Sequence, residues 1–256
     1  MKSRLIALAL CWPLLLGAGA RDFGALSSDD ATCGTGSEVD DLPLGNGMTL
    51  AIWVNVDTLD TTVRRIMSKS SDSVGDGWTW SADQNASNLR IAFEVAFSTS
   101  GMFWRAIDDI TEADGLWQFL ALSYDGDLTT NNPNFYRGTE AANVVLLTTD
   151  SGTDPTGTYD TDGAFNLMIG NRETTQDRAF DGRMAWAQVW HKTLTLAELR
   201  QAQWHPCTVV DNLVRCVPLW DGASPEQDIM NDGDCTIGGA SAVNQGPPVL
   251  WGGSVF

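Results

Sequence analysis

Short segments of alternating apolar residues, repeated along the whole chain, constrain the fold more than any other feature of this sequence. In Met48–Asp57, Leu50, Ile52 and Val54 share one face, whereas Trp53 points to the opposite face. A period of two in short segments rich in β-branched and aromatic residues predicts β-strands. The same pattern predicts four more strands, at Leu89–Phe97, Leu116–Tyr124, Phe165–Ile169 and Met184–Trp190.

Loops rich in Gly, Asp, Asn and Thr separate these segments, and one segment has a helical pattern. In Thr195–Trp204, Thr195 can cap a helix, Glu198 follows three residues later, and Leu199 lies on a short apolar side. Several of the strands are apolar on both faces, which is typical of the inner sheet of a sandwich. The sequence therefore predicts an all-β fold, a two-sheet antiparallel β-sandwich with one short helix.

The first twenty residues have the layout of a signal peptide. Lys2 and Arg4 precede the apolar run Leu5–Leu16, and Ala18-Gly19-Ala20 provides a small-residue cleavage site. An apolar run of twelve residues is too short to cross a bilayer as a helix. We therefore expect residues 1–20 to be removed, which leaves a chain long enough for one large all-β domain or two small ones.

The chain is strongly acidic, with 15 Lys and Arg against 33 Asp and Glu and a formal net charge of −18. Removing Lys2 and Arg4 with the leader takes the charge from −18 to −20. Such a chain repels phosphate backbones and anionic lipids, so we expect neither nucleic-acid nor membrane-surface partners. A hydrophobic content of 43% with 11 Trp is enough to build a core. No second apolar run approaches the length of a membrane span, so no membrane insertion is expected.

Cysteine usage agrees with export. Cys11 lies in the leader, and the four remaining cysteines allow three disulfide connectivities. Cys207 and Cys216 flank a hairpin-like stretch of eight residues, so they can pair at little loop-closure cost. There is no Cys-x-x-Cys spacing of the kind that binds metals. We expect a secreted or surface-exposed protein with two disulfides among Cys33, Cys207, Cys216 and Cys235.

Four segments, in chain order, carry a specific set of motifs. They are Met48–Val54 (MTLAIWV), Trp117–Gly126 (WQFLALSYDG), Ile169–Asn171 followed by Phe180–Trp190, and Thr193–Leu199 (TLTLAEL). Together they resemble laminin-G-like domains of the concanavalin A-like lectin/glucanase superfamily. The resemblance implies a jelly-roll sandwich. It says little about function, because this fold carries lectins, hydrolases and adhesive modules alike.

The C-terminal part of the chain resembles a piece that opens many domains of this family. Leu213–Gly222 and Asp234–Ala240 match that piece, whereas Arg21–Cys33 resembles the strand that normally follows it. The resemblance therefore implies a circularly permuted strand order. The alternative is a truncated second domain, but about fifty residues cannot bury a sandwich core of their own.

The permuted order sets the expected domain limits and the second disulfide. Residues 206–246 would supply the terminal strands of a single domain spanning 21–246, and 247–256 would form a C-terminal tail. Cys33 and Cys235 would then lie on strands that the unpermuted order places consecutively. The resemblance thus implies the pair Cys33–Cys235, beside the pair Cys207–Cys216 that the short spacing favours.

A structural calcium ion is also implied by the family, through aspartates that correspond here to Asp22 and Asp181. The position that resembles a further aspartate ligand is Ala185. Since Ca²⁺ takes six to eight oxygen ligands, two aspartates alone do not make a site. Asp22 and Asp181 remain the candidate Ca²⁺ ligands, and no other cofactor is expected.

The sequence gives no support for catalysis. Related glucanases place paired carboxylates on one strand, but Glu38–Asp41 lies in a loop and Glu94 has no carboxylate two or four residues away. A Ser–His–Asp site needs a positioned histidine, whereas His191 ends a strand and His205 precedes a proline. We therefore expect a protein that is not an enzyme.

A carbohydrate site is suggested by a pair of tryptophans and an acidic loop. Trp78 and Trp80 are two residues apart, so on a strand they project from one face, where stacked rings could hold a sugar. Oxygen-rich side chains nearby would bind the sugar hydroxyls. The alternative is that both indoles pack into the core and the loop is simply solvated. The candidate ligand-binding residues are Trp78, Trp80, Asp125, Asp127, Asn131 and Asn132.

These observations favour a non-catalytic extracellular module that binds a glycan or glycoprotein surface, with neutral glycans preferred because the chain is so acidic. One alternative is a structural or adhesive protein of a cell envelope, a filament or a virus particle, with the sandwich as scaffold. A diverged glycan hydrolase is the third reading. Exposure of the two indoles in a concave site would favour the first, and their burial the second.

Overall fold

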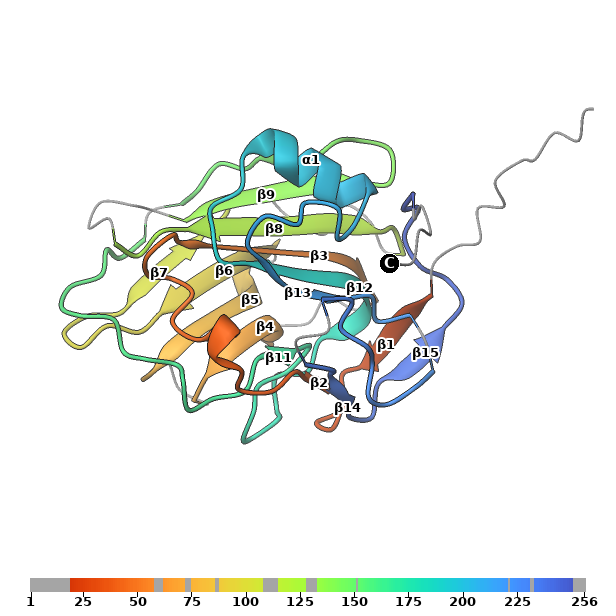
Figure 1. Cartoon of the computed structure of the whole chain (residues 1–256), viewed down its shortest axis with the longest axis horizontal. Coiled ribbons are helices and arrows are strands. Elements are labelled where there is room, and N and C mark those ends of the chain that lie inside the picture. Colours follow the sequence, from red (N-terminus) through yellow and green to blue (C-terminus); the bar gives the residue numbers. More distant parts are fainter. Residues whose placement is uncertain are drawn as a thin grey trace, which may run out of the picture.

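The computed structural model describes residues 19–57, 62–71, 75–85, 88–107, 115–127, 133–150, 152–220, 222–230 and 233–250. These residues form two antiparallel sheets packed face to face (Figure 1), which confirms the predicted sandwich. The eight-stranded sheet follows the order β10 (Val145–Leu146), β9 (Asn134–Thr139), β8 (Gln118–Tyr124), β3 (Met48–Val56), β12 (Asp181–Trp190), β1 (Ala20–Gly24), β15 (Ser241–Val243), and β13 (Leu213–Val217) also pairs with β12.

The seven-stranded sheet forms the second layer. Its order is β14 (Thr236–Ile237), β2 (Ala31–Thr32), β11 (Met168–Ile169), β4 (Arg64–Ser70), β5 (Gly77–Asn85), β6 (Asn88–Val95), β7 (Met102–Arg105). One turn of 3₁₀ helix, Ser37–Val39, joins β2 to β3, and the helix α1, Leu196–Trp204, follows β12. Among the described residues, no helix is long and apolar enough to cross a membrane.

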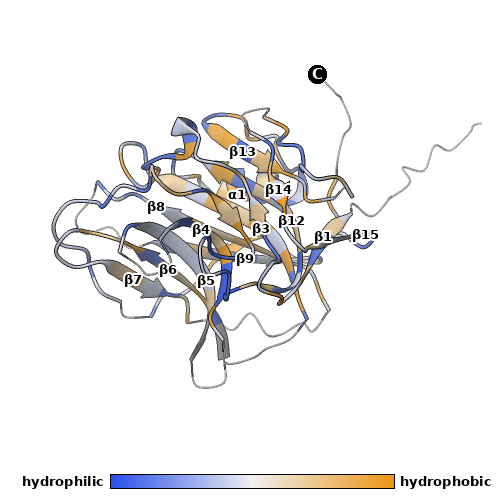
Figure 2. Ribbon diagram, turned by 90° about the horizontal axis from the view of Figure 1, so that it is seen from below, coloured by the Kyte–Doolittle hydropathy of each residue, from blue (hydrophilic) through white to orange (hydrophobic). Residues whose placement is uncertain are grey.

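Strand β3 explains why the central strands are apolar on both faces. Every residue of β3 is buried. Leu50 and Ile52 belong to the core between the two sheets, while Trp53 belongs to a second core on the outer side of the eight-stranded sheet, beneath α1. Figure 2 shows hydrophobic residues concentrated on β13 and on the strands beneath it. The period-two pattern of Met48–Asp57 therefore serves two cores at once.

Helix α1 begins where the sequence predicts. The Thr195 hydroxyl accepts a hydrogen bond from the Glu198 backbone, and the Glu198 carboxylate accepts one from the Thr195 backbone, so the capping box is complete. The indole of Trp53 donates to the Gln203 carbonyl at 3.0 Å, which fixes the helix on the sheet. The predicted helix is confirmed.

The predicted strand at Phe165–Ile169 is shorter than expected. Only Met168 and Ile169 pair with neighbouring strands. The Phe165 carbonyl accepts a hydrogen bond from the buried Lys69 ammonium at 2.6 Å. A buried ammonium must satisfy its three donors, and that of Lys69 also contacts the Asp162 carbonyl and the Asp40 carboxylate, both at 2.9 Å. The Phe165 carbonyl is therefore held by a side chain and not by a neighbouring strand.

The C-terminal segment supplies strands to both sheets. β13 pairs with β12, β14 with β2, and β15 with β1, so the first and last strands lie side by side (Figure 1). This arrangement agrees with the permuted order, and 21–246 as the limits of the domain stay a prediction. Ala20, assigned above to the leader, is buried and begins β1, where it pairs with Val243 of β15. Removal of residues 1–20 stays a prediction.

Covalent and ionic links hold the C-terminal segment in place. Cys33 is joined to Cys235 and Cys207 to Cys216, with Cα atoms 4.1 Å and 5.9 Å apart, so both predicted disulfides are confirmed. The guanidinium of Arg21 forms a buried ion pair with Glu226 at 3.0 Å. Because a buried charge left without its partner costs several kcal/mol, this pair ties β1 to the segment before β14.

Candidate functional site

Trp78 and Trp80 lie in the core between the sheets, not on the surface. Both side chains have an exposed fraction of 0%. Trp78 packs against Phe93 with ring centroids 6.3 Å apart, and Phe93 in turn meets Tyr124 edge-on at 5.6 Å. Neither indole can therefore offer a ring face to a sugar, and the expectation that they form a platform is wrong.

The acidic loop after β8 begins with carboxylates that already have partners. Asp127 accepts a hydrogen bond from the Gly45 backbone at 2.9 Å, and Asp125 accepts one from the Asp127 backbone at 3.1 Å. Both oxygens therefore help to close turns at this edge of the sandwich. Asn131 and Asn132, the other two predicted loop residues, lie outside the described residues.

The candidate calcium ligands lie on adjacent strands. Asp22 is paired in register with Arg183, and Asp181 with Gly24, in the ladder between β1 and β12. No group of three or more His, Cys, Asp or Glu in the described part of the chain is arranged so that it could hold a metal ion. Calcium binding by Asp22 and Asp181 would need backbone carbonyls or water as further ligands, and it stays a prediction.

The charge around Asp22 makes stability depend on pH. Burial and the neighbouring Asp57 raise the pKa of Asp22, although Arg183 acts in the opposite direction. A carboxyl whose pKa is higher in the folded state stabilises the fold below its unfolded-state pKa, and this stabilisation is lost as the pH rises through the folded-state value. Burial raises the pKa of Asp30 and Asp162 in the same way.

We therefore expect Asp22→Asn to raise the melting temperature at pH 7, by up to about 3 °C, and to lose this gain as the pH falls toward 4. Thermal unfolding from pH 4 to 8 measures the effect, with Asp154→Asn, at an exposed position, as control. A lower melting temperature at pH 7 would contradict the sign. If added calcium raised the melting temperature of the wild type but not that of Asp22→Asn, the Asp22 carboxylate would be a metal ligand.

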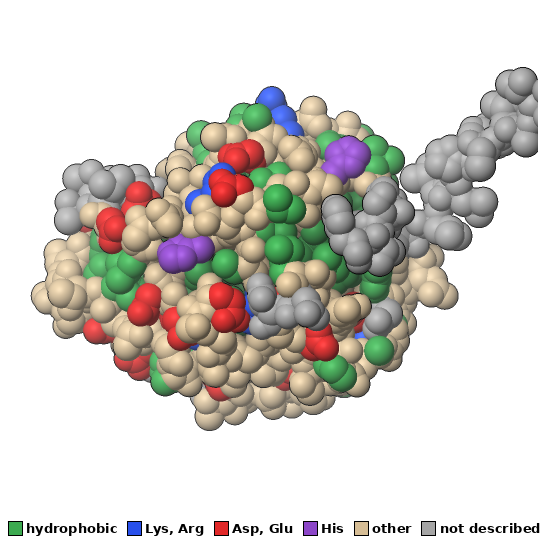
Figure 3. All heavy atoms as spheres, viewed as in Figure 1, with side chains coloured by type: hydrophobic (Ala, Val, Ile, Leu, Met, Phe, Trp, Pro, Cys, Tyr) green, Lys and Arg blue, Asp and Glu red, His purple; other side chains and the backbone are tan. Residues whose placement is uncertain are grey.

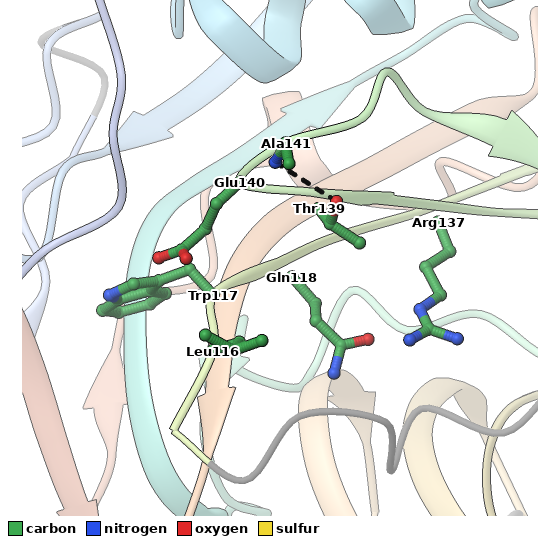
Figure 4. A pocket seen from close by; sticks show the side chains of 7 residues that line it. All are labelled: Leu116, Trp117, Gln118, Arg137, Thr139, Glu140 and Ala141. Carbon is green, nitrogen blue, oxygen red and sulfur yellow. Dashed lines mark hydrogen bonds between the residues drawn. The ribbon is translucent and has the colours of Figure 1, made fainter.

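A pocket of about 210 Å³ opens at the end of β8 and β9, where the sequence predicts no site (Figure 4). Gln118 and Arg137 project to one side, and the Glu140 carboxylate lies above the ring of Trp117. Leu116 is half exposed at this end of the strand. The lining combines an apolar wall with a carboxylate, a guanidinium, an amide and a hydroxyl, contributed by Leu116, Trp117, Gln118, Arg137, Thr139, Glu140 and Ala141.

Helix α1 positions one wall of this pocket. The buried Gln203 side chain donates to the carbonyls of Thr139 and Ala142, at 3.1 Å and 2.9 Å, and accepts from the Val144 backbone at 2.7 Å. Three hydrogen bonds to one amide fix the turn that carries Glu140. A Cβ atom at Gly138 would lie 2.5 Å from the Gln203 amide nitrogen, so a glycine is needed for this close approach.

Sequence reasoning missed this pocket for a clear reason. Its residues look like the end of one strand and an ordinary turn, Gly138–Asn143, and no single motif marks them. The only signal in the sequence was the pair Arg137 and Glu140, which follows the strand Leu116–Tyr124. Many protein surfaces carry such a pair. The pocket exists because Gln203, more than sixty residues away in the sequence, holds the turn in place.

Comparison with known proteins shows the family to which the chain belongs. A family model described as the concanavalin A-like lectin/glucanases superfamily matches residues 28–200. The chain belongs to this superfamily. No curated protein sequence matches the chain. The expected family is therefore confirmed, and the C-terminal strands β13, β14 and β15 lie outside the matched range.

Two solved structures share the fold at low sequence identity. A "putative carbohydrate binding protein" from Bacteroides ovatus ATCC 8483 is 15% identical, with a TM-score of 0.64, over 91% of this chain and 62% of that one. The enzymatically active domain of tailspike protein 2 from bacteriophage CBA120 is 11% identical, with a TM-score of 0.52, over 77% of this chain and 29% of that one. This superfamily member thus spans less than two thirds of either protein.

Proposed function

We propose that this superfamily member is a non-catalytic, secreted carbohydrate-binding module whose ligand occupies the pocket at the end of β8 and β9. The observation that carries the proposal is the lining of that pocket, where the polar side chains of Glu140, Arg137 and Thr139 lie beside apolar ones. Sugar rings present apolar faces edged by hydroxyl groups, and this mixture of groups complements both. The shared fold of the Bacteroides ovatus protein agrees with such a role.

The size of the pocket limits what it holds. A volume of about 210 Å³ is below the ~300–1,000 Å³ usual for drug-sized ligands, so it suits one sugar residue of a longer chain. Trp117 is only 4% exposed and serves as a wall and not as a stacking platform. We therefore expect hydrogen bonds to Glu140 and Arg137, and not aromatic stacking, to dominate recognition.

The carboxylates of the described pocket residues support the part of the proposal that excludes hydrolysis. Glycosidases place two carboxyl groups about 5–10 Å apart on either side of the scissile bond. Among the seven described residues that line the pocket, Glu140 is the only carboxylate. Export is part of the proposal, because two disulfides are typical of proteins in oxidising compartments.

Glu140→Ala should weaken binding of a neutral oligosaccharide by about 10-fold or more, because a hydrogen bond to a charged group contributes about 1.5–3 kcal/mol. A glycan-array screen, with and without calcium, selects the ligand, and calorimetric titration then measures its affinity for wild type and variant. Asp154→Ala, which removes an exposed carboxylate from the loop beside β7, is the matched control. The proposal would be overturned if Glu140→Ala and Asp154→Ala bound the oligosaccharide with equal affinity. Release of reducing ends from the oligosaccharide by the wild type would also overturn it.

The burial of Trp78 and Trp80 favours one other function. With both indoles in the core, the sandwich has the character of a scaffold, as expected for a structural or adhesive surface protein. This alternative predicts no ligand on a glycan array. It also predicts that Glu140→Ala leaves every property of the protein unchanged.

A further inference from the structure

Glu140 is the unpaired charge of the pocket at the end of β8 and β9. Its side chain is exposed, and no described residue forms an ion pair or a hydrogen bond with its carboxylate. The other charged group among the described lining residues is the Arg137 guanidinium, which has an interaction partner of its own. A ligand that enters this pocket therefore meets a carboxylate whose charge is not neutralised.

The positive charge of Arg137 lies away from this carboxylate. Figure 4 shows the Glu140 carboxylate above the ring of Trp117, with the Arg137 guanidinium on the other side of the pocket. No ion pair joins Arg137 to Glu140 in the described structure. The pocket is therefore negative at its Glu140 end, although its lining contains one charge of each sign.

The turn that carries Glu140 is fixed in place before any ligand binds. The backbones of Thr139 and Ala142 exchange two hydrogen bonds, at 3.1 Å and 3.4 Å. The Trp204 indole donates to the side-chain oxygen of Asn143 at 2.8 Å, which ties the far end of the turn to α1. These contacts add to those of the buried amide described above. Since the turn is already ordered, Glu140 can bind a ligand at little further cost in conformational entropy.

Apolar side chains next to Glu140 strengthen its interaction with a cation. Leu116 is half exposed at this end of the pocket, and the Trp117 ring lies beneath the carboxylate. Apolar neighbours lower the local dielectric constant, so charges attract more strongly here than on an open polar surface. A sugar hydroxyl would give Glu140 one hydrogen bond, whereas an ammonium group would also neutralise its charge.

The charge of the whole chain acts in the same direction. The formal net charge is −18, and Figure 3 shows acidic side chains scattered over a face on which few basic ones appear. Such a protein attracts cationic ligands and repels anionic ones. The net charge therefore disfavours acidic glycans, and the unpaired Glu140 carboxylate favours basic glycans over neutral ones.

We propose that the pocket binds a glycan with free amino groups, and that Glu140 forms an ion pair with one protonated amine. This inference rests on the proposed function, because it names the class of sugar that enters the same pocket. A volume of about 210 Å³ suits one amino-sugar residue of such a chain. The Thr139 hydroxyl accepts a hydrogen bond from the Ala141 backbone at 3.3 Å and can donate its own proton to a sugar oxygen.

A matched pair of ligands provides the main test. One ligand is an oligosaccharide of glucosamine, and the other is the same oligosaccharide with every amino group acetylated. Calorimetric titrations are made at a pH at which the amines are protonated and in about 100 mM salt, which screens attraction beyond roughly 10 Å. We expect wild type to bind the amino chain at least about 10-fold more tightly than the acetylated chain, because only the amino chain forms an ion pair with Glu140.

Glu140→Gln tests the role of the charge. The variant keeps a hydrogen-bonding side chain of nearly the same shape, and because Glu140 is exposed its melting temperature should equal that of wild type. We expect binding of the amino chain to weaken at least about 10-fold and binding of the acetylated chain to change much less. Asp154→Asn, which removes one exposed carboxylate elsewhere, should change neither affinity. Unchanged binding of the amino chain by Glu140→Gln would overturn the inference.

The other outcomes separate this inference from the proposed function. Equal binding of both chains by wild type, with Glu140→Ala weakening both, would leave a sugar site and overturn only the preference for amino groups. If a glycan array gave a ligand but neither glucosamine chain bound, again only the inference would be overturned. An array without any ligand would overturn both. An oligolysine of equal charge that bound as tightly as the amino chain would assign the pocket to basic peptides and overturn the inference.

Discussion

Replacing both Cys33 and Cys235 with serine should lower the free energy of unfolding by about 5 kcal/mol, the largest effect we expect from any change to this protein. The two cysteines are separated by 202 residues, so their disulfide closes almost the entire chain into one loop. Loop-closure entropy grows with the logarithm of loop length, and a loop of this size gives about 5 kcal/mol. Many single domains are no more stable than this in total.

The second disulfide provides the control for that experiment. Cys207 and Cys216 are only 9 residues apart, so replacing both with serine should cost about 2.5 kcal/mol. Urea unfolding of the three proteins, without reductant, measures the difference. Equal losses in both variants would show that chain entropy does not govern the contribution of either disulfide.

Trp80→Ala should unfold the protein partially or completely, with a loss of about 3–5 kcal/mol. The Trp80 side chain is fully buried in the core between the sheets, beside Phe93 and Met67 on the flanking strands. Removing a buried indole forfeits its burial and leaves a cavity that the neighbours fill only in part. Any loss of ligand binding in this variant is therefore expected to follow unfolding and not the loss of a contact.

Trp80→Phe separates these effects. It keeps an aromatic ring in the core and removes an indole Nε1 that has no hydrogen-bond partner, so it should cost much less than the alanine variant. Urea unfolding and binding to an oligosaccharide, measured on the same preparations, test the expectation. If Trp80→Ala kept wild-type stability and lost only binding, the indole would be a surface contact and its burial in the core would be wrong.

Local patterns in the sequence were sufficient for several central strands and for the helix. The alternation in Met48–Asp57 predicted β3, because a strand that separates two cores must be apolar on both faces. Thr195 and Glu198 predicted the start of α1, since a capping box involves only residues within one turn. The family motifs added the order of the terminal strands, and through it the pairing of Cys33 with Cys235.

A similar alternation around Trp78 and Trp80 indicated that both indoles face the core, which the carbohydrate hypothesis did not take into account. In Gly77–Ala82 the tryptophans alternate with Thr79 and Ser81, which places the apolar side chains on one face and the hydroxyls on the other. The apolar face of a sandwich strand normally points inward, and the structure places both indoles there. The hydroxyls of Thr79 and Ser81 lie instead on the outer face, beside Arg65.

The sequence by itself determined the central strands, the helix, the sandwich and the two disulfides, because these follow from side-chain periodicity, local capping and motif order. Only the tertiary structure decided where a ligand could bind. The pocket depends on Gln203 reaching the turn that carries Glu140, and the loop of Arg172 and Arg178 is held against β4 by the hydrogen bond from the Arg65 backbone to the Arg178 carbonyl. Contacts between residues sixty to more than one hundred positions apart leave no periodic trace in a single sequence, since each partner is locally an ordinary polar residue.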